Sequence, residues 1–323
     1  HLSLRRQRQM CIRDSFKMKI IFAGTTDFAV HHLRLVHESS HEVSMVLTQP
    51  DRKSGRGRSL KPTPVKVFSE KNSLELCLPI NLKNNLEVIE KVKSVKADLL
   101  LVVAYGQIIP KEILSASRLG SVNVHASILP EWRGASPIEH MILSGKDIGG
   151  LTYMKMDEGL DTGPMLQVHE CKINERETKQ SLEKKLEALS TKNLINFLNA
   201  LEEGKVKETS QDDSLSSYAR KIEKKDREID CLKETSTQID RKIRALSLEN
   251  SCFLHHKDKR LILLETIPVE KKTKPGKFFI SEGSLLLGCS EGSCLKILRI
   301  QLPGKSPINA KDFISGYRDW LEK

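Results

Sequence analysis

Short apolar runs alternate with amphipathic segments along the first two thirds of the chain, which predicts β-strands separated by α-helices. The predicted strands cover residues 19–23, 43–48, 99–104 and 121–125. The predicted helices cover residues 29–38, 85–96 and 180–200. The run 99–104 is apolar at every position, as expected of a parallel strand that is covered on both faces. This part of the chain is therefore predicted to form a doubly wound, mostly parallel α/β sheet, Rossmann-like in its alternation.

The last hundred or so residues follow another pattern. One helical segment, 236–246, is followed by short alternating runs at 260–266, 277–281, 284–289 and 295–302. Several short strands after one helix predict a small β-barrel. A polar stretch precedes this part, so the sequence predicts a catalytic domain at 18–205, a linker at 206–217 and a C-terminal domain at 218–323.

The first seventeen residues lead into no predicted element. They carry five basic residues and one acid, and Met18 is the better start. An Arg-rich organelle presequence is one interpretation, and an upstream stretch foreign to the native protein is the other. We favour the second, because the acid and the lack of an amphipathic repeat are unusual in a presequence.

Composition adds limits on compartment and metal chemistry. No apolar run approaches the ~20 residues of a membrane helix, and no secretory signal is recognisable, so we expect a protein of the cytoplasm rather than of an organelle or a membrane. The seven cysteines are scattered and form no Cys-x-x-Cys pair. Reduced thiols and no metal site are the expectation.

Charge is distributed unevenly between the two parts. Residues 18–213 contain 26 basic and 26 acidic residues, whereas 214–323 contain 22 basic and 15 acidic residues. A basic C-terminal domain fits a polyanion such as RNA. By charge alone, a solvated Lys-rich surface that binds nothing is an equal alternative.

The candidate chemistry lies around the strand 121–125. Asn123 and His125 are two residues apart, so both side chains point to the same face of the strand, and Asp161 follows in Leu-Asp-Thr-Gly. An amide can donate to a forming oxyanion, an imidazole can move a proton, and a carboxylate can orient the ring. The alternative is that these residues only cap a loop. We favour a site, because sites of open parallel sheets lie at the carboxyl ends of the strands.

Longer motifs then indicate a family. Residues 123–137 read Asn-Val-His-Ala-Ser-Ile-Leu-Pro-Glu-Trp-Arg-Gly-Ala-Ser-Pro, and 154–163 read Met-Lys-Met-Asp-Glu-Gly-Leu-Asp-Thr-Gly. With 20–29, 48–52 and the Gly-Lys pair at 304–305, the chain from Met18 onward resembles the formyltransferases that use 10-formyltetrahydrofolate. The resemblance implies formyl transfer to the α-amino group of methionine on initiator methionyl-tRNA. It also implies catalytic roles for Asn123, His125 and Asp161, and an oligonucleotide-binding type of C-terminal barrel.

The resemblance also assigns the folate site. The family's binding segment matches Ser127, Ile128, Leu129 and Pro130, and the loop with Val103, Tyr105 and Gly106 is expected to line the same pocket. Trp132 and Arg133 are candidates for its entrance, and the alternative is that Trp132 only packs, which is the commoner case for a tryptophan near a proline. The chain has no G-x-G-x-x-G fingerprint, so we expect no nicotinamide or flavin cofactor.

A basic segment at 49–64 is expected to meet the RNA. It is rich in glycine and proline and is predicted to be a mobile loop without regular structure. Its basic residues, which suit phosphate contacts, are Arg52, Lys53, Arg56, Arg58 and Lys61. In the family this loop enters the acceptor end of the tRNA, and we carry that role over to Arg56 and its neighbours.

Some positions depart from the family pattern, and other functions remain open. Thr26 stands where proline is usual, Ala126 where glycine follows the histidine, and 247–251 replaces a proline-containing turn.

One alternative is a small-molecule enzyme, either an amino-sugar formyltransferase or a formyl-folate hydrolase. Another is a noncatalytic RNA-binding protein. We expect a monomer, because no apolar interface pattern stands out in the sequence.

Overall fold

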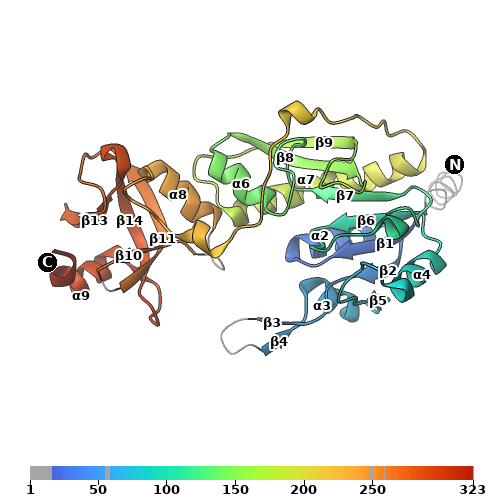
Figure 1. The fold of residues 1–323 in the computed structure, drawn as a ribbon, viewed down its shortest axis with the longest axis horizontal. Coiled ribbons are helices and arrows are strands. Elements are labelled where there is room, and N and C mark those ends of the chain that lie inside the picture. Colours follow the sequence, from blue (N-terminus) through green and yellow to red (C-terminus); the bar gives the residue numbers. More distant parts are fainter. Residues whose placement is uncertain (1–16, 55–58, 247–250, 258, 323) are drawn as a thin grey trace, which may run out of the picture. The chain divides into compact units, whose positions relative to one another are not determined.

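The structure is a computed structural model that describes residues 17–322 except 55–58, 247–250 and 258 (Figure 1). The chain divides into two compact units. The N-terminal unit comprises the chain up to Pro137 together with Ile148–Cys171 and Glu183–Tyr218. The C-terminal unit comprises Ile138–Asp147, Lys172–Leu182 and the chain from Ala219 onward.

A seven-stranded sheet forms the centre of the N-terminal unit, in the order β5-β2-β1-β6-β7-β8-β9 (Figure 1). Its strands are β1 (Lys19–Gly24), β2 (Glu42–Leu47), β5 (Leu76–Cys77), β6 (Leu99–Val103), β7 (Ser121–His125), β8 (Ile148–Lys155) and β9 (Met165–Lys172). Pairing is parallel from β5 to β7, and β8 runs antiparallel to β7. The four predicted strands and the doubly wound α/β fold are confirmed, whereas the sequence did not predict β5, β8 and β9.

Helices cover both faces of this sheet, because its central strands are apolar on both faces. They are α2 (Asp27–His37), α3 (Pro64–Lys71), α4 (Leu86–Ser94), α5 (Lys111–Leu114) and α7 (Lys179–Glu202). On one face, Ile21 and Ala23 of β1 share a buried cluster with Val88 and Ile89 of α4. The predicted helices 29–38, 85–96 and 180–200 are thereby confirmed as α2, α4 and α7.

The opposite face carries α2 and α7. The buried His32 of α2 is hydrogen-bonded to Ser190 of α7 at 2.7 Å, and Phe197 of α7 packs on Tyr153 of β8 with ring centres 4.5 Å apart. Thr26, one of the departures from the family pattern, is the N-cap of α2, and its hydroxyl accepts a bond from the Ala29 amide. The substitution therefore keeps a good start for this helix.

The basic segment after β2 has regular structure, unlike the loop predicted from its composition. Residues on either side of 55–58 form a hairpin of β3 (Arg52–Ser54) and β4 (Ser59–Lys61), in which Arg52 pairs with Lys61. An ion pair of 2.7 Å between Asp51 and Lys66 joins the start of the hairpin to α3. The mixture of Gly, Pro and basic residues carries no alternating apolar pattern from which this pairing could be predicted.

The C-terminal unit is built on a curled antiparallel sheet in the order β10-β11-β14-β13-β12, with β15 beside β14. Its elements are α6 (Pro137–Ser144) apart from the first residue, η2 (Lys224–Arg227), α8 (Ser236–Ala245), β10 (Phe253–His256), β11 (Lys259–Val269), β12 (Phe278–Ser281), β13 (Ser284–Gly288), η4 (Ser290–Gly292), β14 (Cys294–Gln301), β15 (Ile308–Asn309) and α9 (Ala310–Glu322). Facing pairs such as Leu285 with Ile297 and Leu287 with Leu295 are fully buried and form its core. This curled sheet agrees with the expected small β-barrel of oligonucleotide-binding type, and the helix predicted at 236–246 is confirmed as α8, while β10, β15 and α9 were not predicted.

Three further observations concern the described residues only. None of their helices is long and apolar enough to cross a membrane. Their cysteines are free thiols, and no cluster of three or more His, Cys, Asp or Glu side chains suits a metal ion in this part of the chain. Residues 247–250 of the altered segment 247–251 lie outside these residues.

Candidate active site

Asn123 and His125 lie near the carboxyl end of β7, a central strand that pairs with β6 on one side and β8 on the other. His125 is only 4% exposed, and Asn123 is half-buried. Their alternate positions on one strand place both side chains on the same face, as predicted. Asn123 pairs with Met154 and His125 pairs with Thr152, so pairing with the antiparallel strand β8 fixes the register of both residues in the sheet.

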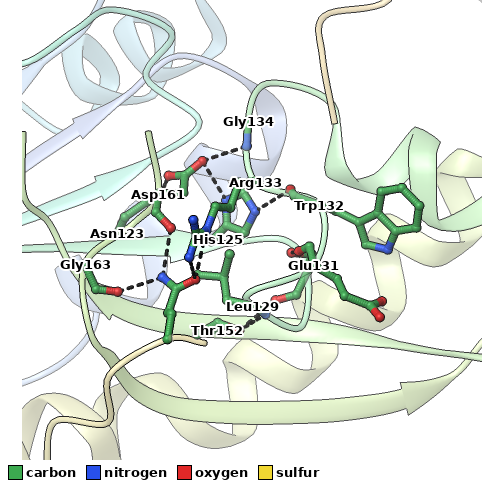
Figure 2. Close-up of polar contacts among 12 residues, drawn as sticks. Asn123, His125, Leu129, Glu131, Trp132, Arg133, Gly134, Thr152, Asp161 and Gly163 are labelled. Carbon is green, nitrogen blue, oxygen red and sulfur yellow. Dashed lines mark hydrogen bonds and ion pairs between the residues drawn. The ribbon is translucent and has the colours of Figure 1, made fainter. Parts of the chain in front are cut away.

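Asp161 reaches both residues from the loop that follows β8 (Figure 2). Its Oδ1 accepts a hydrogen bond of 3.3 Å from Asn123 Nδ2, and its Oδ2 accepts one of 2.8 Å from the Gly134 amide. The same Oδ2 lies 3.7 Å from His125 Nδ1. Thus the structure brings together the three side chains that the sequence selected.

The other edge of the His125 ring is also occupied. Its Nε2 lies 2.9 Å from the carbonyl oxygen of Trp132, and because a carbonyl only accepts, this nitrogen carries a proton. Trp132 has a positive φ of 62°, which an L-residue rarely adopts, and this turn aims its carbonyl at the ring. The imidazole is therefore fixed between the Trp132 carbonyl and the Asp161 carboxylate.

The segment expected to bind folate is organised by a single hydroxyl. Thr152 Oγ1 accepts a bond of 3.1 Å from the Leu129 amide and donates one of 2.7 Å to the Ser127 carbonyl. The side chains of Ser127 and Leu129 are buried, whereas Ile128 and Pro130 are partly exposed. Only the latter two can present side-chain surface to a ligand without rearrangement.

The preceding loop lies at the end of the neighbouring strand β6. Val103 and Tyr105 point inward and are buried, and the exposed positions are Ala104 and Gly106, both with positive φ. The Tyr105 carbonyl accepts bonds of 2.8 Å from Thr25 and from Gln49, which fix the loop. Burial raises the pKa of the Tyr105 phenol, so it stays protonated.

Ala126 was a possible source of strain, because glycine is usual there in the family. Its φ is not positive, and its side chain is buried directly after His125. The extra methyl group therefore requires no unusual backbone conformation.

Two residues at the site had no assigned role in the chemistry predicted from the sequence. Gln211 donates bonds of 2.8 Å and 2.7 Å to the carbonyls of Asp161 and Gly163. Arg133, expected at a pocket entrance, is instead 2% exposed, and its guanidinium donates to the Gln211 amide oxygen. Gln211 comes from the stretch predicted to be a linker, and no periodic pattern there points to the site.

The expected RNA contacts are described in part. Arg52 and Lys61 are exposed and opposite each other in the β3–β4 hairpin, and the backbone of Lys53 belongs to β3. Arg56 and Arg58 lie outside the described residues. Among the described positions, Arg52 and Lys61 are thus two exposed cations that face each other as a cross-strand pair.

Comparisons with known proteins can now be set beside this geometry. A family model described as formyl transferase matches residues 17–198, and one described as formyl transferase, C-terminal domain, matches 221–318. Methionyl-tRNA formyltransferases of Pseudoalteromonas translucida and Coxiella burnetii are each 39% identical to this chain, over 94% of it and over 95% and 97% of their own lengths. A sugar 3N-formyl transferase, WlaRD, solved in the presence of dTDP and 5-N-formyl-THF, shares the fold with a TM-score of 0.60. It is 20% identical, and the match covers 90% of this chain and 99% of that one. From these matches over both of its parts, we conclude that the chain belongs to the formyl transferase family.

Proposed function

We propose that this protein transfers the formyl group of 10-formyltetrahydrofolate to the α-amino group of methionyl-initiator-tRNA, a step of translation initiation. The observation that carries the proposal is the 39% identity to methionyl-tRNA formyltransferases over 94% of the chain. That similarity includes the C-terminal part, and the basic excess of residues 214–323 suits a polyanion such as tRNA. The contacts among Asn123, His125 and Asp161 supply the chemistry.

Attack of an amine on a formyl carbon turns the formyl oxygen into an anion. An amide side chain has two N–H groups, and Asp161 accepts from Asn123 through one nitrogen contact of 3.3 Å. The remaining N–H of Asn123 suits the developing oxyanion. Losing one such donor typically costs about 2.7–4 kcal/mol of transition-state stabilisation.

The attacking nitrogen must also lose a proton, and N10 of tetrahydrofolate must gain one as its bond to the formyl carbon breaks. His125 is the proton-carrying group, and Asp161 stabilises the charged ring and orients it. The separation of 3.7 Å between His125 Nδ1 and Asp161 Oδ2 exceeds a hydrogen bond, and such contacts commonly shorten when substrate binds. Because Nε2 is held by the Trp132 carbonyl, Nδ1 is the nitrogen that we assign to proton transfer.

The ends of β6 and β7 suit a flat, partly apolar folate. In the two loops, Ala104 and Gly106 are exposed, and Ile128 and Pro130 are partly exposed. Ile108 is 92% exposed and continues the apolar rim. We therefore assign folate binding to the loops 103–106 and 127–130, with Val103, Tyr105, Ser127 and Leu129 acting as buried supports.

The hairpin after β2 suits the phosphates of tRNA. Arg52 and Lys61 repel each other across one pair, and a polyanion would relieve that repulsion. The basic residues assigned to tRNA are Arg52, Lys53, Arg56, Arg58 and Lys61. The basic excess of residues 214–323 adds a second cationic surface.

Two narrower statements complete the proposal. The reaction takes place in the cytoplasm, because initiator tRNA and ribosomes share that compartment. The protein acts as a monomer, since its substrate is a large macromolecule and the sequence shows no apolar interface pattern.

The test is formylation of methionyl-tRNA with 10-formyltetrahydrofolate by the full chain. Asn123→Ala should lower kcat about 100- to 1,000-fold. Asn193→Ala is the matched control, because its amide donates to a backbone carbonyl within α7. It should retain wild-type turnover.

Three results would change the assignment. Turnover on an amino sugar but not on methionyl-tRNA would favour a small-molecule formyltransferase, and release of formate without a tRNA product would favour a hydrolase. Binding of tRNA with no formylation in any condition would favour a noncatalytic RNA-binding protein.

A further inference from the structure

Asp161 is held in place by two residues, the buried Arg133 and the half-buried Gln211. We propose that these two residues form a positioning relay that fixes the Asp161 carboxylate beside His125. The inference rests on the proposed function, since it assigns support residues to the same site. Neither residue is assigned contact with a substrate, so both are positioning residues and not catalytic ones.

The backbone at Asp161 needs external support. Its φ is +53°, in the left-handed region that costs an ordinary residue energy unless its surroundings enforce it. Gln211 Nε2 bonds the carbonyl of Asp161 itself at 2.8 Å and that of Gly163 at 2.7 Å. A single amide group therefore holds both ends of the turn that aims the carboxylate at His125 and Gly134.

Arg133 determines which way the Gln211 amide faces. Its Nε and one terminal nitrogen donate to Gln211 Oε1 at 3.0 Å and 2.8 Å. With the amide oxygen occupied by two N–H donors, the amide nitrogen must face the two carbonyls. The orientation of Gln211 is thus set by the planar fork of a guanidinium.

Burying the Arg133 guanidinium has an unfavourable desolvation free energy. The side chain is 2% exposed, and burying a guanidinium is unfavourable unless its N–H groups are bonded. Its ion pair with Asp213 spans 2.7 Å, but that carboxylate is 82% exposed and therefore well screened. An ordinary apolar residue would fill the space at lower cost, so the retained guanidinium is best explained by the relay.

The backbone ties the same segments together. The amides of Trp132 and Arg133 donate to the side chain and the carbonyl of Ser217, both at 2.9 Å. Because the Trp132 carbonyl holds His125 Nε2, one segment, 209–218, supports both partners of the imidazole. The relay accordingly predicts an effect on the chemical step and little effect on substrate binding.

Gln211→Glu separates the relay from simple loss of packing. The glutamate keeps the size and still accepts from Arg133, but it presents an acceptor oxygen to two carbonyls. We expect kcat to fall about 10- to 100-fold, as for a small misplacement of a catalytic group, with KM for both substrates within about twofold. Gln211→Leu should behave alike, and Gln167→Leu on β9 is the control that should leave kcat unchanged.

A second readout does not depend on activity. The Gly134 amide donates to Asp161 Oδ2 at 2.8 Å, so its hydrogen exchange reports whether the carboxylate stays in place. In protein labelled with ¹⁵N-glycine, exchange at Gly134 should become at least about tenfold faster in Gln211→Glu than in wild type or Gln167→Leu.

The outcomes separate the inference from the proposed function. Faster Gly134 exchange with wild-type protein inactive on methionyl-tRNA would support the relay and sink the proposed function. Unchanged Gly134 exchange, or a rise in KM with kcat preserved, would overturn the relay even if formylation is confirmed.

Discussion

Acidification should destabilise the N-terminal unit through one buried histidine, His32 on α2. The side chain is fully buried, and burial lowers its pKa from 6.5 to about 4. Its Nδ1 donates to the Phe28 carbonyl at 2.7 Å, so the neutral ring accepts from the Ser190 hydroxyl at Nε2, also at 2.7 Å. The neutral ring satisfies both nitrogens, and a second proton would place a charge in a fully buried site, which is unfavourable.

The sign of the effect follows from the two pKa values. Between pH 6.5 and about 4 the unfolded chain binds a proton at this site and the folded chain does not, so stability falls as the pH falls. The difference between the folded and unfolded pKa values corresponds to about 3 kcal/mol of unfolding free energy, of which about 2 kcal/mol is lost between pH 7.5 and 5.0. Above pH 7.5 the site contributes no further dependence.

The assay is urea unfolding at pH 7.5 and 5.0, followed by hydrogen exchange in α2 and α7 so that the N-terminal unit is observed by itself. In His32→Gln, the difference in the free energy of unfolding between pH 7.5 and 5.0 should be about 2 kcal/mol smaller than in wild type, whatever the stability of the variant at pH 7.5. His37→Gln, at an exposed position of the same helix, should keep the wild-type difference. An equal pH-dependent loss in wild type and His32→Gln would refute the reasoning.

Two further predictions concern activity and RNA binding. Gly163→Ala should lower kcat about 10- to 100-fold in the formylation assay, because a Cβ there would lie 1.9 Å from the Lys155 carbonyl oxygen and displace the loop that carries Asp161. Gly316→Ala is the control, and it should leave kcat unchanged because the space around its Cβ is open. Replacing both Arg52 and Lys61 by alanine should weaken tRNA binding and lower the slope of log K against log salt by about 2, measured by filter binding, and an unchanged slope would remove these cations from the interface.

Much of the fold was predictable because its signals are local. The strands β1, β2 and β6 are short, largely apolar runs. In β7, Ser-Val-Asn-Val-His, the period of two along a strand is enough to predict that Asn123 and His125 share one face. The strands β8 and β9 were missed. Gly149-Gly150 interrupts the start of β8, and β9 has no fully buried residue and mixes apolar with polar residues.

The relay could not have been predicted by the same means. Arg133 and Gln211 are separated by 78 positions, and their contact follows from the path of the whole chain. A glutamine among aspartates and serines has the composition of a solvated linker. Likewise, the bond from His125 to the Trp132 carbonyl depends on a backbone turn that side-chain identity does not reveal.

The return of residues 209–218 to the site changes how this protein should be cut into fragments. A catalytic fragment ending at residue 205, the boundary suggested by composition, would remove Gln211 and leave the carbonyls of Asp161 and Gly163 without that donor. A cut before Ser214 would keep Gln211 but delete Ser217, the partner of the Trp132 and Arg133 amides. Inactivity of either fragment would reflect damage to the catalytic loop as well as loss of the basic domain. Only a fragment that continues through Tyr218 isolates the contribution of the C-terminal part to turnover.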